Sequence, residues 1–135
     1  MSDVRKIAGV NEGQFFDPSW SFHCRVIWPC RPEHLAGYAA AAFPGSKVDI
    51  PKGKFCGLTL VFDNGETEVY VIALEKKPIN SLQLSSLAHE AFHVTNYVLD
   101  DRGMKLSYKT QEAYCYLLDS IFKRCLDLTR AKIIL

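Results

Sequence analysis

The sequence predicts an α+β domain in which a small sheet packs against two long helices. Two observations support this prediction. First, two β-type segments, 57–62 and 67–74, flank an Asp-Asn-Gly-Glu turn at 63–66, which is the pattern of an antiparallel hairpin. Second, two stretches, from Asn80 to about 101 and from about 110 to 130, repeat apolar residues every three or four positions, as amphipathic helices do. A length of 135 residues corresponds to one domain, 1–135.

The first third of the chain is expected to contribute one strand and one short helix. Residues 1–19 mix charged residues, Gly and Asn without a period, so we expect an irregular N-terminal arm. Residues 20–28 alternate aromatic and polar side chains, which predicts a strand. Pro32 and Glu33 then suit the first turn of an alanine-rich helix that ends before Pro44.

The hairpin strands differ in how deeply they are expected to lie in the sheet. The second half of 67–74 is apolar on both faces, as in a strand inside a sheet and under a helix. Segment 57–62 is therefore the better candidate for the outer strand. Together with 20–28, the hairpin predicts a small three-stranded sheet.

The helix after Asn80 carries the main functional motif, His89-Glu90-Ala91-Phe92-His93. Asn80 suits the N-cap, and Gly103 follows the last turn. Residues four apart lie on one helical face, so the two imidazoles can reach one metal ion. Glu90 is one step around the helix and can contact a water molecule on that metal without binding the metal.

A third metal ligand is expected from the next helix. Glu112 follows His93 by nineteen residues and lies in the first turn of the helix predicted from about Thr110. Two His and one Glu, with a position left for water, are typical of catalytic rather than structural zinc sites. Two plainer interpretations remain open. The helix motif can form a His–Glu hydrogen-bond network, and Glu112 can be a helix-start acid that the helix dipole favours.

The HExxH motif with a downstream Glu resembles the gluzincin metallopeptidases, with the spacing of the thermolysin-type branch. The resemblance implies a minimal zincin-like fold in which His89, His93 and Glu112 bind one Zn²⁺ and Glu90 is the general base. It also implies that an extended peptide or protein substrate pairs with the outer strand, 57–62. Residues 84–122 are more loosely similar to small zincin-like proteins of phages and prophages.

One departure from the gluzincin pattern concerns the residues that support the ligands. Larger gluzincins usually place an Asp one turn after the ligand Glu, and here that position is Tyr116. The acidic residues Asp100, Asp101 and Asp119 are candidates to orient a ligand histidine. The candidates for a donor to the oxyanion are Tyr108, Tyr114 and His23.

Composition and charge exclude several other classes of protein. A net charge of +1, without a basic run, does not favour nucleic acid or membrane as a partner. The N-terminus lacks the apolar core of a signal peptide, so we expect a cytoplasmic location, in the host cytoplasm if a phage encodes the chain. The five cysteines show no Cys-x-x-Cys spacing and are expected to be free. The alternative to a peptidase is a non-catalytic, zinc-stabilised binding or regulatory module of a phage or mobile element.

Overall fold

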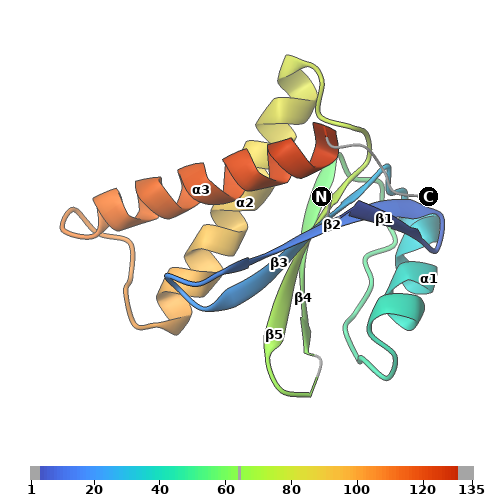
Figure 1. Cartoon of the computed structure of the whole chain (residues 1–135), viewed down its shortest axis with the longest axis horizontal. Helices are drawn as coiled ribbons and strands as arrows, with labels where there is room; N and C mark the ends of the chain where they lie inside the picture. The colour runs from blue at the N-terminus through green and yellow to red at the C-terminus, as the bar shows by residue number, and fades with distance from the viewer. Residues whose placement is uncertain (1–3, 64, 131–135) are drawn as a thin grey trace.

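The computed structural model describes residues 4–63 and 65–130, and these form an α+β fold with three helices and a five-stranded mixed sheet (Figure 1). The elements in chain order are β1 (Val4–Ile7), β2 (Val10–Asp17), β3 (Phe22–Trp28), α1 (Pro32–Ala42), β4 (Gly57–Asp63), β5 (Glu68–Leu74), α2 (Ser81–Asp101) and α3 (Gln111–Arg130). In the described part of the chain, none of the helices has both the length and the apolar character that a bilayer-spanning segment requires.

The sheet has the strand order β1-β2-β3-β5-β4. Among the described strands, only the β3–β5 pair is parallel, with Arg25 opposite Val71. The β4–β5 hairpin is antiparallel, with Leu60 opposite Val71. Strand β4 is therefore an edge strand, whereas β5 lies inside the sheet and is buried from Val69 to Leu74. Both findings confirm the predicted positions of the two hairpin strands.

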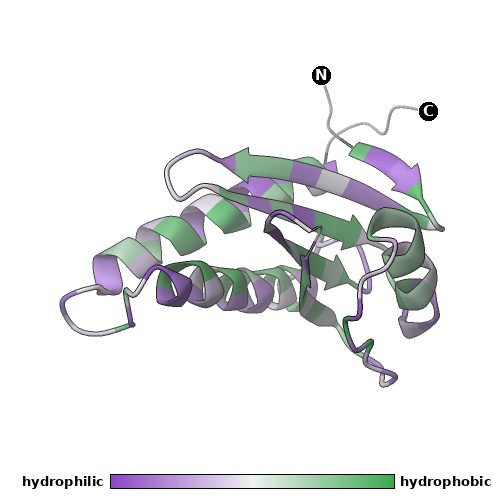
Figure 2. Ribbon diagram, turned by 90° about the horizontal axis from the view of Figure 1, so that it is seen from below, coloured by the Kyte–Doolittle hydropathy of each residue, from purple (hydrophilic) through white to green (hydrophobic). Residues whose placement is uncertain are grey.

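The sheet separates two hydrophobic clusters. One cluster joins the sheet to α2 and α3, and includes Val26, Ile72, Val94 and Ile121. The other lies on the opposite face, under α1 and the segment that follows it. Figure 2 shows this pattern, with hydrophobic residues concentrated in the middle strands and alternating with polar ones along α2 and α3. The predicted polar-and-apolar periodicity of the two long helices is confirmed.

Helix α2 begins and ends where its capping residues require. The Asn80 side chain accepts a hydrogen bond from the Gln83 backbone N–H at 3.0 Å, which satisfies one of the free amides of the first turn. After the last turn, Gly103 has a φ of +78°, a conformation that costs glycine little. The Met104 amide then donates to the Leu99 carbonyl at 2.9 Å. These contacts fix the length of the helix that carries the motif.

The prediction of an irregular N-terminal arm is wrong, because β1 and β2 form a hairpin there and enlarge the sheet to five strands. The connecting turn uses Ala8 and Gly9, with φ values of 49° and 87°. Alanine rarely adopts a positive φ, so the sequence does not show this turn. The alternation in β2 is also obscured, because Glu12 is buried and Gly13 lies where a Cβ atom would be 2.9 Å from Leu128 Cβ.

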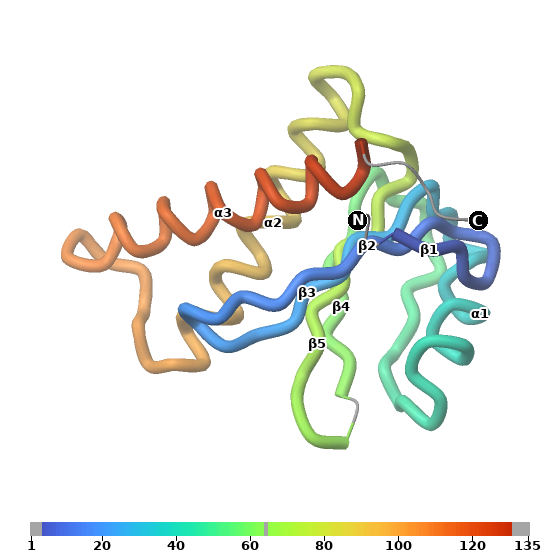
Figure 3. The backbone as a smooth tube through the Cα atoms, viewed as in Figure 1, coloured from blue at the N-terminus to red at the C-terminus, as the bar shows by residue number. Residues whose placement is uncertain are grey.

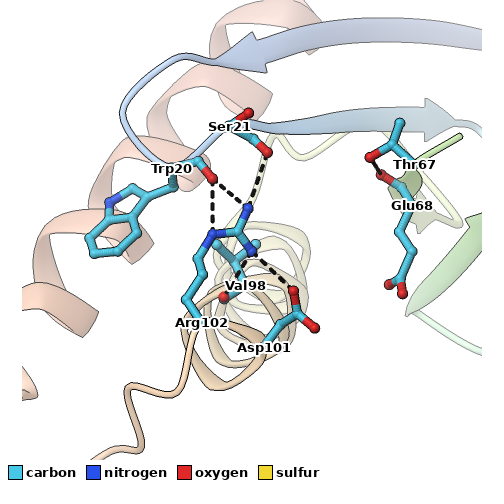
Figure 4. A network of polar contacts seen from close by, with 7 residues as sticks. All are labelled: Trp20, Ser21, Thr67, Glu68, Val98, Asp101 and Arg102. Carbon is cyan, nitrogen blue, oxygen red and sulfur yellow. Dashed lines mark hydrogen bonds and ion pairs between the residues drawn. The ribbon is translucent and has the colours of Figure 1, made fainter.

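The turn between β2 and β3 is fastened to the end of α2 by one arginine. The Arg102 guanidinium donates to the backbone carbonyls of Trp20 and Ser21, with the Nη2–Ser21 O distance at 3.1 Å (Figure 4). Its Nη1 donates to the Val98 carbonyl at 3.1 Å. In Figure 3 the β2–β3 turn lies near the C-terminal end of α2, where Arg102 contacts it. This contact ties the C-terminal end of α2 to the β2–β3 turn.

Candidate functional site

The middle of α2 brings His89 and His93 together, as their four-residue spacing predicts. Their Nε2 atoms are 3.1 Å apart, and their rings are edge to face with centroids 4.8 Å apart. Two nitrogens at this separation can both lie about 2.05 Å from one ion with an angle of about 100° between the bonds. Without a metal, the same distance allows one imidazole N–H to donate to the other. The His89 side chain is 68% exposed, so the pair opens to solvent.

Glu90 points in another direction, under the edge strand. Its side chain is only 8% exposed. The Thr59 hydroxyl donates to Glu90 Oε1 at 2.8 Å, and Glu90 Oε2 lies 3.8 Å from His89 Nε2. The carboxylate therefore reaches from the helix to β4 while one of its oxygens faces the histidine pair.

Gly57 makes room for this carboxylate. A Cβ atom at position 57 would lie 2.9 Å from Glu90 Cγ and 3.3 Å from Glu90 Oε2. Protein atoms essentially never approach a Cβ as closely as the first of these distances. Gly57 and Thr59 are two residues apart in one strand and so face the same side of the sheet. The Glu90 side chain consequently packs onto the backbone of β4 itself.

Gly57 and Thr59 also present backbone groups at the outer edge of the described sheet. The Cys56 carbonyl accepts from the Glu75 amide at 3.0 Å, which makes these two residues a hydrogen-bonded pair. Such pairs alternate along an antiparallel ladder with pairs whose N–H and C=O groups point away from the partner strand. The backbone groups of Gly57, Thr59 and Val61 therefore point away from β5 and toward the position of an added strand.

The structure does not bring Glu112 to the histidines. Glu112 is exposed in the first turn of α3, whose buried residues are Tyr114, Leu117, Ile121, Cys125 and Thr129. Nine residues, about two and a half helical turns, separate Glu112 from Ile121, so the two leave the helix on opposite sides. Among the described residues, no group of three or more His, Cys, Asp or Glu side chains is placed to hold a metal ion.

The predicted oxyanion donors lie apart from the histidine pair or have other partners. His23 alternates with the inward-facing Phe22 and Cys24, so it lies on the face of the sheet opposite α2. The Tyr114 hydroxyl is engaged, because it donates to the Met104 carbonyl at 2.7 Å. Tyr108 is 90% exposed on the connection between α2 and α3.

The acidic candidates for orienting a ligand histidine also have other surroundings. Asp100 is 3.4 Å from Lys105 Nζ, and Asp101 is 3.5 Å from Arg102 Nη1. Asp119 is exposed on α3. The partner that the structure does supply to the motif, Thr59 on Glu90, was missed by the sequence reasoning. The available signal was a small residue and a hydroxyl residue alternating on the strand predicted to lie outermost.

Three hollows in the surface of the described residues are lined by residues other than the histidine pair. One of about 770 Å³ lies between the segment after α1 and the β4–β5 hairpin, and includes Phe43, Lys47 and Glu68. Two others, of about 430 and 410 Å³, lie beside β2. The His89 side chain, which is 68% exposed, opens to solvent next to the edge strand. Comparison of the chain with protein-family models, with curated proteins and with solved structures finds no match.

Proposed function

We propose that this protein is a zinc-dependent metallopeptidase that hydrolyses peptide bonds, with His89 and His93 as zinc ligands and Glu90 as the general base. The observation that carries the proposal is the 3.1 Å separation of the two Nε2 atoms, with the Glu90 carboxylate 3.8 Å from one of them. A hydrogen-bonded pair of histidines explains the first distance alone. It does not explain a nearly buried carboxylate held beside them with one oxygen directed at the pair.

The roles of the side chains follow from their positions. Zinc, when bound, supplies a Lewis acid and lowers the pKa of a coordinated water molecule to about 7. His89 and His93 use the Nε2 atoms that already converge. Glu90 Oε1 is occupied by the Thr59 hydroxyl, so Oε2 is the oxygen that accepts the proton of the attacking water and passes it to the leaving amine.

The fold and the substrate belong to the same proposal. An antiparallel outer strand beside the motif helix, followed by a second long helix, is the arrangement expected of a minimal zincin-like domain. The outward-facing backbone groups at Gly57, Thr59 and Val61 suit an extended peptide that adds to the sheet as a further strand. Such a peptide would run along 57–62, directly beside the Glu90 carboxylate.

Glu112 is proposed as the third zinc ligand on the strength of its spacing alone. Glu112 is exposed on α3, and among the described residues it forms no metal-binding group with the two histidines. Zinc affinity of Glu112→Gln tests this role. If Glu112→Gln binds zinc as tightly as the parent, the third position is filled by water or by another residue.

The test of the peptidase combines metal analysis with one substitution. The purified protein is loaded with zinc and assayed against a library of unstructured peptides, beside Glu90→Gln. We expect both proteins to bind one zinc ion, and we expect Glu90→Gln to cleave at least about 100-fold more slowly, because a general base typically contributes about 10²–10⁴-fold. Equal rates for the two proteins would exclude Glu90 as the base, and failure to bind zinc would exclude the metal site.

The second candidate is a zinc-stabilised binding or regulatory module of a phage or mobile element that cuts nothing. The observation favouring it is the exposure of the His89 side chain, since binding and active sites are usually concave. In that case zinc would raise the unfolding temperature, peptides would bind, and the library would stay intact with both the parent and Glu90→Gln.

A further inference from the structure

We infer that Thr59 is the positioning residue for Glu90, and that the outer strand, rather than the motif helix, fixes where this carboxylate points. The inference rests on the proposed function for its catalytic meaning, but its structural content can be tested separately. It assigns a role to a residue that the HExxH motif does not include.

Glu90 is hydrogen-bonded to the outer strand. In the described part of the chain, the Glu90 carboxylate accepts one hydrogen bond. The donor is the Thr59 hydroxyl, 2.8 Å from Oε1. The same hydroxyl lies 3.3 Å from the Glu90 backbone carbonyl. A carboxylate that is nearly excluded from water needs such a donor, because burying it unpaired is costly. The carboxylate is therefore held by β4 at one oxygen and left available at the other.

Glu90 also packs closely on the outer strand. The Glu90 Cγ lies against the backbone of β4 at Gly57, where a Cβ atom would be 2.9 Å away. Gly57 has no positive φ that would require glycine, so the need here is for space and not for backbone conformation. A hydroxyl residue and a glycine, two positions apart on the face toward α2, thus form a seat for one side chain. We call Gly57 and Thr59 the β4 seat.

The β4 seat lies on an edge strand of the sheet. Its backbone groups are those that point outward from the edge of the sheet. A strand that adds to β4 would hydrogen-bond to the same two residues that hold Glu90. Substrate docking and placement of the base would then depend on one strand, which gives a physical reason for catalysis to require an extended substrate.

The experiment is a double-mutant cycle in urea denaturation, done on the metal-free protein so that neither zinc nor activity enters. The variants are Thr59→Val, Glu90→Ala and the pair of substitutions together. Valine keeps the shape and the β propensity of threonine. Because hydrogen bonds to charged groups stabilise strongly, we expect Thr59→Val to lower the folding equilibrium constant by about tenfold or more when Glu90 is present, and by much less when residue 90 is alanine.

Thr59→Ser is the matched control, because serine keeps the hydroxyl and loses a methyl group. It should retain most of the coupling to Glu90 that valine removes. Equal losses from Thr59→Val with Glu90 and with alanine at position 90 would overturn the inference, and so would a serine variant without the coupling.

A second cycle tests the steric part of the seat. Gly57→Ala should destabilise the protein when Glu90 is present and be tolerated in the Glu90→Ala background, where the Cγ atom that it would meet is absent. If Gly57→Ala costs the same in both backgrounds, the seat is wrong at this residue. This cycle also provides an answer if one of the Thr59 variants does not fold.

The catalytic consequence is measured on the zinc-loaded protein. Thr59→Val should lower kcat by about 10–100-fold with zinc content and KM unchanged, and Thr59→Ser should restore much of it. A parent protein that cleaves nothing would remove the proposed function, while the denaturation cycles would still decide whether Thr59 positions Glu90. Coupling in the cycles together with an unchanged kcat in Thr59→Val would show that the seat stabilises the fold and does not position the base.

Discussion

Two buried glutamates, one on each face of the sheet, are held in opposite ways. Glu12, on β2, is 1% exposed and its oxygens accept from Tyr38 at 2.5 Å, Arg25 at 3.1 Å and Arg5 at 2.8 Å. Glu90, on α2, has a side chain that is 8% exposed and accepts from Thr59. In the described residues its one ion-pair partner is His89, 3.8 Å away.

The difference separates a carboxylate with hydrogen-bond donors on both oxygens from one with a hydrogen-bond donor on a single oxygen in the described residues. Burial would raise the pKa of Glu12, but the hydrogen bonds from Tyr38 and Arg5 and the charges of Arg25 and Arg5 outweigh it and hold the pKa below its ordinary value. Glu12 joins β1, β2, β3 and α1, and both of its oxygens accept hydrogen bonds. In the described residues, Glu90 Oε2 accepts no hydrogen bond and lies 3.8 Å from His89 Nε2.

The surroundings of Glu12 show how its charge is built into the packing of that face. The Arg25 guanidinium lies 4.5 Å above the Phe43 ring, which stacks on Phe62 with centroids 4.4 Å apart. Burial and the adjoining Glu12 carboxylate also raise the pKa of Tyr38 above its ordinary value, so the phenol stays protonated and donates. A charged group in this setting is part of the packing of α1 against the sheet.

The largest effect that separates the two faces is expected in metal binding. Zinc sites with about four ligands bind with about 10–16 kcal/mol, so one ligand contributes about 2.5–4 kcal/mol. We expect His93→Ala to weaken zinc binding by about 100-fold or more, measured by competition with a chromogenic chelator. His23→Ala, on the opposite face of the sheet, is the control and should bind zinc like the parent. Equal zinc affinity for the parent and both variants would show that His93 does not bind the metal.

The next effect concerns the face of the sheet that carries Glu12. Glu12→Gln should lower the free energy of unfolding by about 3 kcal/mol, because it leaves Arg25 nearly buried without its counter-charge. Urea denaturation measures this change. Glu33→Gln, an exposed acid on α1, is the control and should stay within about 0.5 kcal/mol of the parent. A Glu12→Gln variant as stable as the control would show that the charge of Glu12 is dispensable.

The smallest effect is the pH dependence of stability. Because the pKa of Glu12 is lower in the folded than in the unfolded state, its contribution is complete above the ordinary value of about 4.5 and is lost as the pH falls through the folded value. The difference in unfolding free energy between the parent and Glu12→Gln should therefore be constant from pH 7 to about 5 and shrink below that. A constant difference down to pH 3 would contradict the lowered pKa.

The sequence by itself determined the elements whose local pattern was strong. The hairpin with its outer and inner strands, the short helix after Pro32 and the length of α2 between Asn80 and Gly103 were predicted correctly. The convergence of His89 and His93 followed from helix geometry alone. The middle of the predicted hairpin turn, Asn64, lies outside the described residues.

Tertiary structure decided the features that depend on residues far apart in the chain. The N-terminal hairpin was not predicted, because Glu12 is buried with partners from other elements, among them Tyr38 and Arg25, and because Ala8 adopts a positive φ in the connecting turn. Glu112 had the expected spacing, but spacing does not fix which face of α3 packs inward, and its apolar residues turn that acid to solvent. The β4 seat for Glu90 arises because β4 packs against α2. Thr59 and Glu90 are thirty-one residues apart in the chain, and no local sequence pattern encodes a contact over that distance.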